Sequence, residues 1–508
     1  MIRCLPRLMA LAAVLALVAC GRPAGDNGAA LRVDMVAVPG GGEVEAAITA
    51  ATQVGLVGFD ASGGVVPALA SSWRIAGDGR SVIFRLRPRA WSDGKRVTAA
   101  DVVASFRRAA APGSRNRSRP LLAALANGAA VLAGDLPSSA LGIDAPVDSV
   151  VEVRAAGAMP GLLALLAQPD LAVVAPGPRP EALGPLRVAD AARRPIALTR
   201  NPLAAPDTTH ATLMLTPVDD PGPAIARFAR ERTDVVVGGG LAGFDDARLM
   251  LASNVLRVEP SWGVYGYLVH AKGPLADPRV RRALAMAVER DGLGSRLFGV
   301  GLPPVLGLVP PLPSEPAPAL PDWAIQAPPA RLDLARQLLA AAGFGPTTPL
   351  TVTISLPDAR EHAAIAAAVA ADWARIGVRT QTIARSPADH ALAVARGTFE
   401  LAVTERSAPF DSPLAFLTPF ACRANGGGGY CNPGADALVT AARAAPDATT
   451  AATTLGAAEA AMVADTPMIA LFAPVRWALV SRQVTGWTAN AAGQHPLALL
   501  GIDRQVKR

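Results

Sequence analysis

Residues 67–108 read PALASSWRIAGDGRSVIFRLRPRAWSDGKRVTAADVVASFRR, and they are the most informative part of the chain. Every second residue from 82 to 86 is apolar, which is the pattern of a half-buried strand. Two Asp-Gly dipeptides predict turns, because glycine supplies the positive φ that such turns need. Thr98 precedes Asp101 by three residues, the spacing of a capping box, so we expect a helix from residue 99. The stretch therefore predicts a hairpin that leads into a capped helix.

Composition sets the number of domains and the kind of partner. The chain has 508 residues, of which 18% are charged, so we expect two or three domains. The formal charge of +7 is spread along the chain and only 4% of residues are aromatic, which argues against a nucleic-acid partner. G-x-S-x-G, H-E-x-x-H and Walker A motifs are all absent, and the five histidines are widely separated. We therefore expect no enzyme, no metal site and no cofactor.

The first 20 residues predict export. Two arginines precede the apolar residues 8–18, and Leu-Val-Ala-Cys follows, ending at Cys20. Eleven residues rise only about 16 Å as a helix, which is too short for a bilayer core of about 30 Å. We interpret residues 1–20 as a lipoprotein signal peptide with lipidation at Cys20, and residues 21–30 as a tether. The alternative is an ordinary signal peptide that happens to contain a cysteine.

Two further cysteines flank a glycine-rich segment. Cys422 and Cys431 enclose RANGGGGY. In an oxidising compartment two such cysteines should form a disulfide. Half of a metal site is the rival interpretation, but it would need further Cys or His ligands nearby.

Downstream, helical and extended patterns alternate, which predicts an α/β fold with a largely parallel sheet. Residues 303–329 contain about ten prolines and predict an irregular surface loop. Glu361 and His362 are expected on the solvated start of a helix. The expected helices are 277–291, 331–343, 359–376, 387–396, 436–443 and 454–464, and the expected strands are 31–38, 213–216, 233–238, 350–356, 379–383, 400–403 and 468–474.

The motifs A-x-x-W, D-G, F-x-L-R, W-S-D-G and V-T-A-x-D-V-x-x-S-F follow one another within residues 67–108. This arrangement resembles the signature of the family 5 extracellular solute-binding proteins, which supply peptides and related solutes to ABC importers. Further segments are similar to family motifs and keep their order: 201–202, 275–291, 334–344, 397–400, 412–417, 430–438 and 467–471.

The resemblance implies a two-lobed periplasmic-binding-protein fold of type II (cluster C), with three domains and a hinge. Lobe closure would trap the ligand. Domain I would be discontinuous, with the other two domains inserted into it. The expected divisions are 31–57 with 186–264 and 484–508 for domain I, 58–185 for domain II, and 265–483 for domain III.

Two groups of residues are candidates for ligand binding. Trp262, Tyr265 and Tyr267 lie where the chain should cross between lobes, and a binding cleft needs apolar walls with a few polar groups. The alternative is that they pack in the core or the hinge.

The second group is Arg406, Phe410 and Asp411. In peptide-binding family members an Asp in this segment pairs with the α-amine of the ligand, and Pro409 occupies that position here. Either Asp411 takes over the role, or the ligand lacks a free amine. Arg406 could pair with a carboxylate or phosphate of the ligand, or could point to solvent.

We therefore expect a monomeric, lipid-anchored, extracytoplasmic protein that captures peptide-like solutes and delivers them to an ABC permease with its ATPases. A receptor for a non-peptide solute, such as a metal chelate or glycoside, is one alternative. An envelope lipoprotein with an interaction role, which has lost transport, is another.

Overall fold

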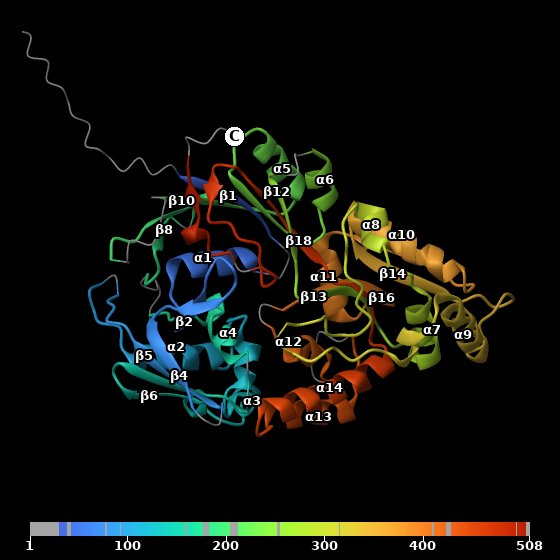
Figure 1. Cartoon of the computed structure of the whole chain (residues 1–508), viewed down its shortest axis with the longest axis horizontal. Coiled ribbons are helices and arrows are strands. Elements are labelled where there is room, and N and C mark those ends of the chain that lie inside the picture. The colour runs from blue at the N-terminus through green and yellow to red at the C-terminus, as the bar shows by residue number, and fades with distance from the viewer. Residues whose placement is uncertain are drawn as a thin grey trace, which may run out of the picture.

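The structure is built on three β-sheets of four or more strands, with helices packed around them (Figure 1). This computed structural model describes residues 30–37, 42–76, 79–91, 93–157, 159, 161–175, 182–190, 192–203, 212–250, 254–313, 315–408, 411–422, 428–493 and 495–503. The predicted signal peptide, Cys20, Pro409 and Phe410 lie outside the described residues.

The first sheet has seven strands and combines distant parts of the chain. Its central strand β1 pairs in parallel with both β10 and β11. Arg32 on β1 binds Asp234, just before β11, through two hydrogen bonds of 2.8 and 2.9 Å. Helices α1 (Glu43–Thr52), α5 (Pro221–Ala229) and α6 (Phe244–Met250) follow strands of this sheet. The strand order is β12 (Leu256–Pro260), β18 (Val475–Val480), β11 (Val235–Gly239), β1 (Leu31–Val36), β10 (Thr212–Val218), β9 (Ile196–Arg200) and β8 (Leu186–Asp190).

The second sheet contains the opening stretch and confirms its predicted hairpin and helix. Its four antiparallel strands are β4 (Ala70–Ile75), β5 (Ser81–Leu86), β7 (Val150–Arg154) and β6 (Ile143–Val147). Phe84 on β5 is fully buried. Helix α2 (Ala99–Ala110) packs on β6 and β7 and begins with the expected capping box. The backbone N–H of Thr98 donates to Asp101 at 2.8 Å, and the Thr98 hydroxyl accepts from the Asp101 N–H at 3.4 Å.

The same region also holds smaller elements. Strands β2 (Val57–Phe59) and β3 (Val65–Pro67) form a short hairpin. Residues 119–134 form two short elements, the 3₁₀ helix Arg119–Ala124 and α3 (Gly128–Ala133), instead of one continuous helix. The break falls at Asn127, whose φ of 60° interrupts the helix. Helix α4 (Leu162–Leu166) follows β7.

The third sheet has five strands in the order β15 (Arg379–Arg385), β14 (Thr351–Pro357), β16 (Leu401–Ser407), β13 (Gly263–Val269) and β17 (Met468–Phe472). β14 is parallel to β15 and β16, whereas β13 is antiparallel to β16 and β17, so the sheet is mixed. Its helices are α7 (Pro278–Ala287), α8 (Leu293–Phe298), α9 (Pro328–Ala341), α10 (Arg360–Ala374), α11 (Pro387–Arg396), α12 (Pro413–Leu417), α13 (Pro433–Arg443) and α14 (Ala448–Asp465).

The chain crosses between the seven-stranded and five-stranded sheets at two places. Ser261 and Trp262 connect β12 to β13, and Ala473 and Pro474 connect β17 to β18. β18 therefore belongs to the seven-stranded sheet, although the expected domain III extends to residue 483. We keep the three-domain division as a proposal and assign residues 475–480 to domain I.

The part that carries the four-stranded sheet also touches the part that carries α13 and α14. The Arg80 guanidinium donates to the carbonyl of Ala445 at 3.1 Å. Gly157 lies so close to Arg443 that an added Cβ would approach the Arg443 carbonyl oxygen to 2.2 Å. The two lobes are therefore in contact at this edge, beside the C-terminal end of α13 (Figure 1).

The proline-rich segment is not the surface loop that its composition predicts. Val305, Leu308 and Leu312 are buried against α14 and the five-stranded sheet. Prolines cannot donate hydrogen bonds, and the N–H groups of Val309 and Ala319 donate to the buried Glu459 side chain at 3.2 and 2.9 Å. A single carboxylate thus allows this irregular backbone to be buried.

Candidate ligand-binding site at the lobe boundary

The two tyrosines proposed from the sequence are core residues. Tyr265 and Tyr267 are both fully buried on β13. The Tyr265 ring stacks on Phe472 with centroids 4.7 Å apart, and its hydroxyl bonds His362. Tyr267 packs near Trp373 in the same core. These contacts favour the packing alternative, so we do not include either tyrosine among the ligand contacts. His362 is itself buried, which corrects its expected solvated position.

Trp262 lies at the crossing between the two sheets. Its backbone N–H donates to the carbonyl of Ala491 at 3.2 Å, and its carbonyl accepts from Ala408 at 2.8 Å. The side chain is half-buried and packs beside the apolar cluster around α12 and α14. It therefore remains a candidate for the wall of a cleft.

Arg406 does not project freely into solvent. Its guanidinium lies over the ring of Phe420, 4.8 Å from the centroid, in a cation–π contact. Burial lowers the pKa of Arg406 to about 10. Asp411 lies two residues before the start of α12. Burial raises the pKa of Glu315, and the charge of Asp411 adds to this rise. Both residues therefore lie beside the lobe boundary, but Arg406 contacts Phe420 whereas Asp411 influences Glu315.

The edge of β16 carries unused backbone groups. The N–H of Ala408 donates to Trp262 and the N–H of His270 donates to Glu400, so even-numbered residues of β16 exchange hydrogen bonds with β13. The N–H and C=O groups of Glu405 and Ser407 therefore point away from β13. On that side β14 pairs only with Leu401 and Ala402, so no strand among the described residues covers this edge.

Glu405 also places a carboxyl group at this edge, and no sequence motif identifies it. Its side chain lies next to Gly240, whose added Cβ would approach Glu405 Oε2 to 2.7 Å. Burial raises the pKa of Glu405 to about 7, although Arg476 and the Leu241 N–H favour the charged form. Gly240 and Leu241 follow β11, so the Glu405 side chain reaches from the five-stranded sheet to the seven-stranded one.

Arg476 on β18 carries the positive charge that favours ionisation of this carboxylate. Burial lowers its pKa, while Glu405, Glu259 and Glu43 act in the opposite direction. Glu259 is already occupied, because His495 bonds it at 2.9 Å and the Trp487 indole donates to it at 2.8 Å. Burial opposes ionisation of Glu259, but its bond with His495 lowers the pKa overall.

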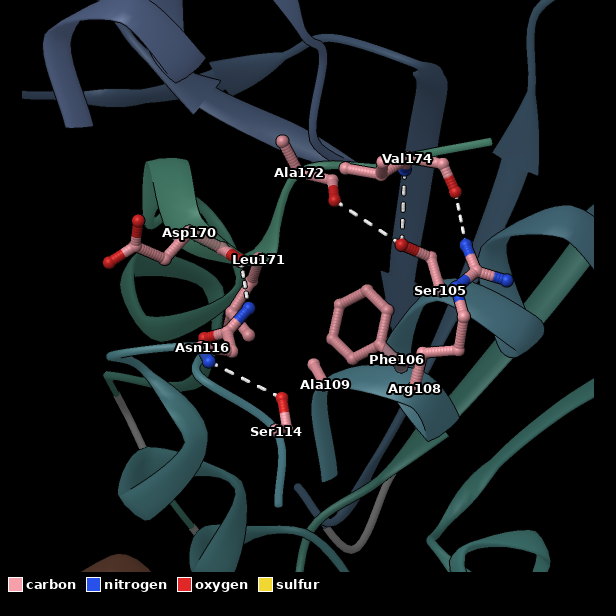
Figure 2. Close-up of a pocket in the computed structure, with 10 residues that line it drawn as sticks. All are labelled: Ser105, Phe106, Arg108, Ala109, Ser114, Asn116, Asp170, Leu171, Ala172 and Val174. Atoms are coloured by element: carbon pink, nitrogen blue, oxygen red, sulfur yellow. Dashed lines mark hydrogen bonds between the residues drawn. The ribbon is translucent and has the colours of Figure 1, made fainter. Parts of the chain in front are cut away.

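A separate pocket of about 200 Å³ lies beside α2 and is drawn in Figure 2. The Ser105 hydroxyl bonds both the Ala172 carbonyl and the Val174 N–H, and Arg108 donates to the Val174 carbonyl. The Asn116 amide donates to the Asp170 carbonyl at 2.5 Å. These polar groups are directed at backbone atoms of the pocket wall, so we do not regard the pocket as the main ligand site.

The described residues contain no group of three or more His, Cys, Asp or Glu side chains placed to hold a metal ion. Within the same residues no helix is both long and apolar enough to cross a membrane. Cys422 and Cys431 form a disulfide, as their spacing predicts.

Two sheets joined by two adjacent crossings, with partly uncovered polar groups between them, define a two-lobed solute-binding protein of the type II periplasmic-binding-protein fold. Residues 64–428 match the bacterial extracellular solute-binding proteins, family 5, middle region. The chain belongs to this family, which is a family of binding proteins.

Relatives of known name support the same assignment. The chain is 27% identical over 465 residues to the periplasmic oligopeptide-binding protein OppA of Salmonella typhimurium, covering 87% of this chain and 84% of OppA. It is similar in structure to Burkholderia pseudomallei OppA, with a TM-score of 0.80, 26% identity, and coverage of 94% and 99% of the two chains. A complex of Haemophilus influenzae OppA with the peptide RPPGFSPFR has the same fold, with a TM-score of 0.80 at 22% identity and coverage of 93% and 99%.

Proposed function

We propose that this protein captures peptide-like solutes outside the cytoplasmic membrane and delivers them to the permease of an ABC transporter. Membership of family 5 and the names of the similar OppA proteins support this proposal. We further propose that Cys20 carries a lipid anchor, which would hold the protein at a membrane of the cell envelope.

The observation that carries the proposal is the uncovered edge of β16 at the lobe boundary. Glu405 and Ser407 direct backbone N–H and C=O groups away from β13. An extended peptide that adds to this edge would pair with those groups through its own backbone. Such pairing does not depend on ligand side chains, so it suits a protein that accepts peptides of varied sequence. Trp262, Arg406 and Asp411 lie near this edge and are proposed to contact the ligand.

A proline substitution tests the edge directly. In Ser407→Pro the lost N–H is one that points away from β13, so the β13–β16 ladder should survive. We expect peptide affinity to fall at least about tenfold, because one hydrogen bond is lost and the ring obstructs the incoming chain. Ser407→Ala is the matched control, since it keeps the backbone N–H and removes only the hydroxyl that bonds Ser261.

Native mass spectrometry of protein purified from its own cells tests the ligand class. A co-purified series of peptide masses is the expected result. A single non-peptide mass, or no binding across a peptide library, would contradict the proposed function. If Ser407→Pro and Ser407→Ala bind peptides equally tightly, the protein still binds peptides, but not along the edge of β16.

A further inference from the structure

The two lobes touch each other at a place apart from the crossings between their sheets. Arg80 directly precedes β5, and its carbonyl accepts from the Ala155 N–H at 2.7 Å. Gly157 follows two residues later, so Arg80 and Gly157 lie side by side at the end of the β5–β7 pair. Both face the connection between α13 and α14, which lies below β13 and β18 in Figure 1.

Arg80 binds the carboxyl end of helix α13. The last carbonyl groups of a helix have no donors within the helix, and they form the negative end of its dipole. α13 ends at Arg443, and the Arg80 guanidinium donates to the carbonyl of Ala445, two residues later, at 3.1 Å. The Arg443 side chain itself donates to the Thr418 hydroxyl at 2.9 Å. Arg80 therefore brings a positive charge to this helix end from the opposite lobe.

Gly157 allows the backbones of the two lobes to approach each other. A Cβ atom added to Gly157 would lie 2.2 Å from the Arg443 carbonyl oxygen and 3.2 Å from the Ala445 carbonyl oxygen. The three atoms nearest to this Cβ all belong to the opposite lobe. Gly157 does not have a positive φ, so its backbone conformation is also open to alanine. The glycine is therefore needed for the contact between the lobes and not for the fold of its own lobe.

The contact is small and partly polar. A cavity of about 40 Å³ lies beside it, with walls from both lobes that include Gly157, Met159, Glu315 and Arg443. Such a volume has room for about two or three water molecules. Small interfaces with charged groups, when they lie between domains of one chain, permit relative motion. This contact can therefore break without unfolding either lobe.

Movement about the crossings would separate the groups in contact. The chain passes between the lobes at residues 261–262 and 473–474. In the part of the chain that the structure describes, no strand pairing joins the four-stranded sheet to the five-stranded one. The Arg80–Ala445 hydrogen bond and the close approach at Gly157 therefore belong to the closed arrangement of the lobes alone.

We propose that Arg80 and Gly157 form an interlobe latch that sets how long a ligand is retained, although neither residue contacts the ligand. This proposal rests on the proposed solute-binding function. A ligand held by both lobes leaves only when the lobes separate, so an interaction made only in the closed arrangement slows its release. Its apparent affinity also scales with the fraction of protein that is closed. Arg80 is thus a positioning residue that acts through α13.

Stopped-flow dissociation of trialanine tests the attractive part of the latch. Arg80→Ala should release trialanine about three- to tenfold faster, because a charged hydrogen bond at a helix end is lost. The association rate should change little. Arg80→Lys should retain part of the effect, since its ammonium still donates to the Ala445 carbonyl. Arg85→Ala is the matched control, because Arg85 is an exposed arginine on β5 and its loss changes the net charge equally. The two alanine variants should unfold at the same urea concentration without ligand.

Gly157→Ala tests the steric part. Its affinity for trialanine should fall at least about tenfold, because the added methyl group collides with the opposite lobe only when the lobes close. Small-angle X-ray scattering of the trialanine-saturated protein should give a larger radius of gyration than for the wild type. Gly301→Ala is the matched control, since no atom beyond its chain neighbours lies within 4 Å of the added Cβ.

Equal release rates for Arg80→Ala and Arg85→Ala would overturn the proposal, as would equal radii of gyration for Gly157→Ala and Gly301→Ala. If Arg80→Ala also unfolds more easily than Arg85→Ala, the results for Arg80→Lys and Gly157→Ala decide. If the wild-type protein binds neither trialanine nor a mixed tripeptide library, the proposed function fails. Scattering of the unliganded protein then tests the latch by itself, and equal radii for the two glycine variants would overturn it.

Discussion

The Tyr265 hydroxyl and the His362 Nδ1 atom share a hydrogen bond of 2.9 Å, and the two rings stack 8° from parallel. Burial holds the pKa of His362 at about 4, so the neutral imidazole accepts from the tyrosine hydroxyl. Tyr265→Phe would leave a buried nitrogen without its donor. We expect the free energy of unfolding to fall by about 1–3 kcal/mol, measured by urea denaturation.

Tyr267 provides the control for this prediction. Its hydroxyl is buried, and among the described residues it has no hydrogen-bond partner. Tyr267→Phe removes an unsatisfied polar atom and keeps the ring, so we expect no loss of stability or a slight gain. Equal losses in the two variants would show that ring packing, and not the hydrogen bond to His362, sets the cost.

Arg290 is expected to be important for stability and not for binding. It is 4% exposed and donates to the carbonyls of Ala470, Ala285 and Val288 at 2.8–3.0 Å. Arg290→Ala would leave these carbonyls without donors and open a cavity. We expect a loss of about 3–5 kcal/mol in the free energy of unfolding.

Arg279, on helix α7, serves as the control. It is exposed and bonds mainly Asp277, two residues away. Arg279→Ala should leave the free energy of unfolding nearly unchanged, because an exposed ion pair contributes little to stability. A loss comparable to that of Arg290→Ala would contradict the distinction between the two arginines.

The disulfide between Cys422 and Cys431 should stabilise the protein through a small loop. The two residues are nine positions apart, and closing a loop of about ten residues contributes about 2.5–3 kcal/mol on the chain-entropy account. The double variant Cys422→Ser with Cys431→Ser should lose about this amount. Reducing agent should destabilise the wild-type protein and leave the double variant unchanged. Two reactive thiols in the denatured, unreduced protein would contradict the disulfide.

The buried carboxyl group of Glu459 should make the free energy of unfolding depend on pH. Burial raises the pKa of Glu459 to about 7, even though two backbone N–H groups favour its charged form. The folded state therefore holds a proton that the unfolded state releases between about pH 4.5 and 7. This contribution to stability is fully present below pH 4.5 and is lost as the pH rises through 7, by about 2–4 kcal/mol. Urea denaturation at pH 5 and 8 should show a smaller pH difference for Glu459→Gln than for the wild-type protein.

Much of the fold follows from local pattern. The hairpin and capped helix at residues 67–108 form as predicted, because alternation, turn residues and the capping box all favour one local structure. β16 is longer than predicted, since Thr404, Glu405 and Arg406 are polar but pair with β13. β18 was not predicted, because Arg476 lies within its apolar sequence. Helix α14 begins at Ala448, capped by Asp447, whereas the predicted helix begins at residue 454.

The site was less predictable for a physical reason. Aromatic residues near a crossing can pack in either a core or a cleft, and only the structure shows that Tyr265 and Tyr267 are buried in the core. Glu405 and Arg476 are 71 positions apart on two different sheets, so no local spacing relates them. A charged residue within an otherwise apolar strand was the one available signal, and it applies to Arg476 alone, because Glu405 stands between Thr404 and Arg406.

The position of β18 has a consequence for biosynthesis. β18 lies between β11 and β12, so both of those strands lack a neighbour until residue 480 has been made. By then about nineteen-twentieths of the chain exists. The first lobe begins at β1 yet is completed by almost the last segment synthesised, and contacts of such long range form slowly. A chain that ends before Val475 should therefore leave one edge of β11 open and β12 without a partner strand, and should aggregate, whereas the complete chain joins both strands through β18.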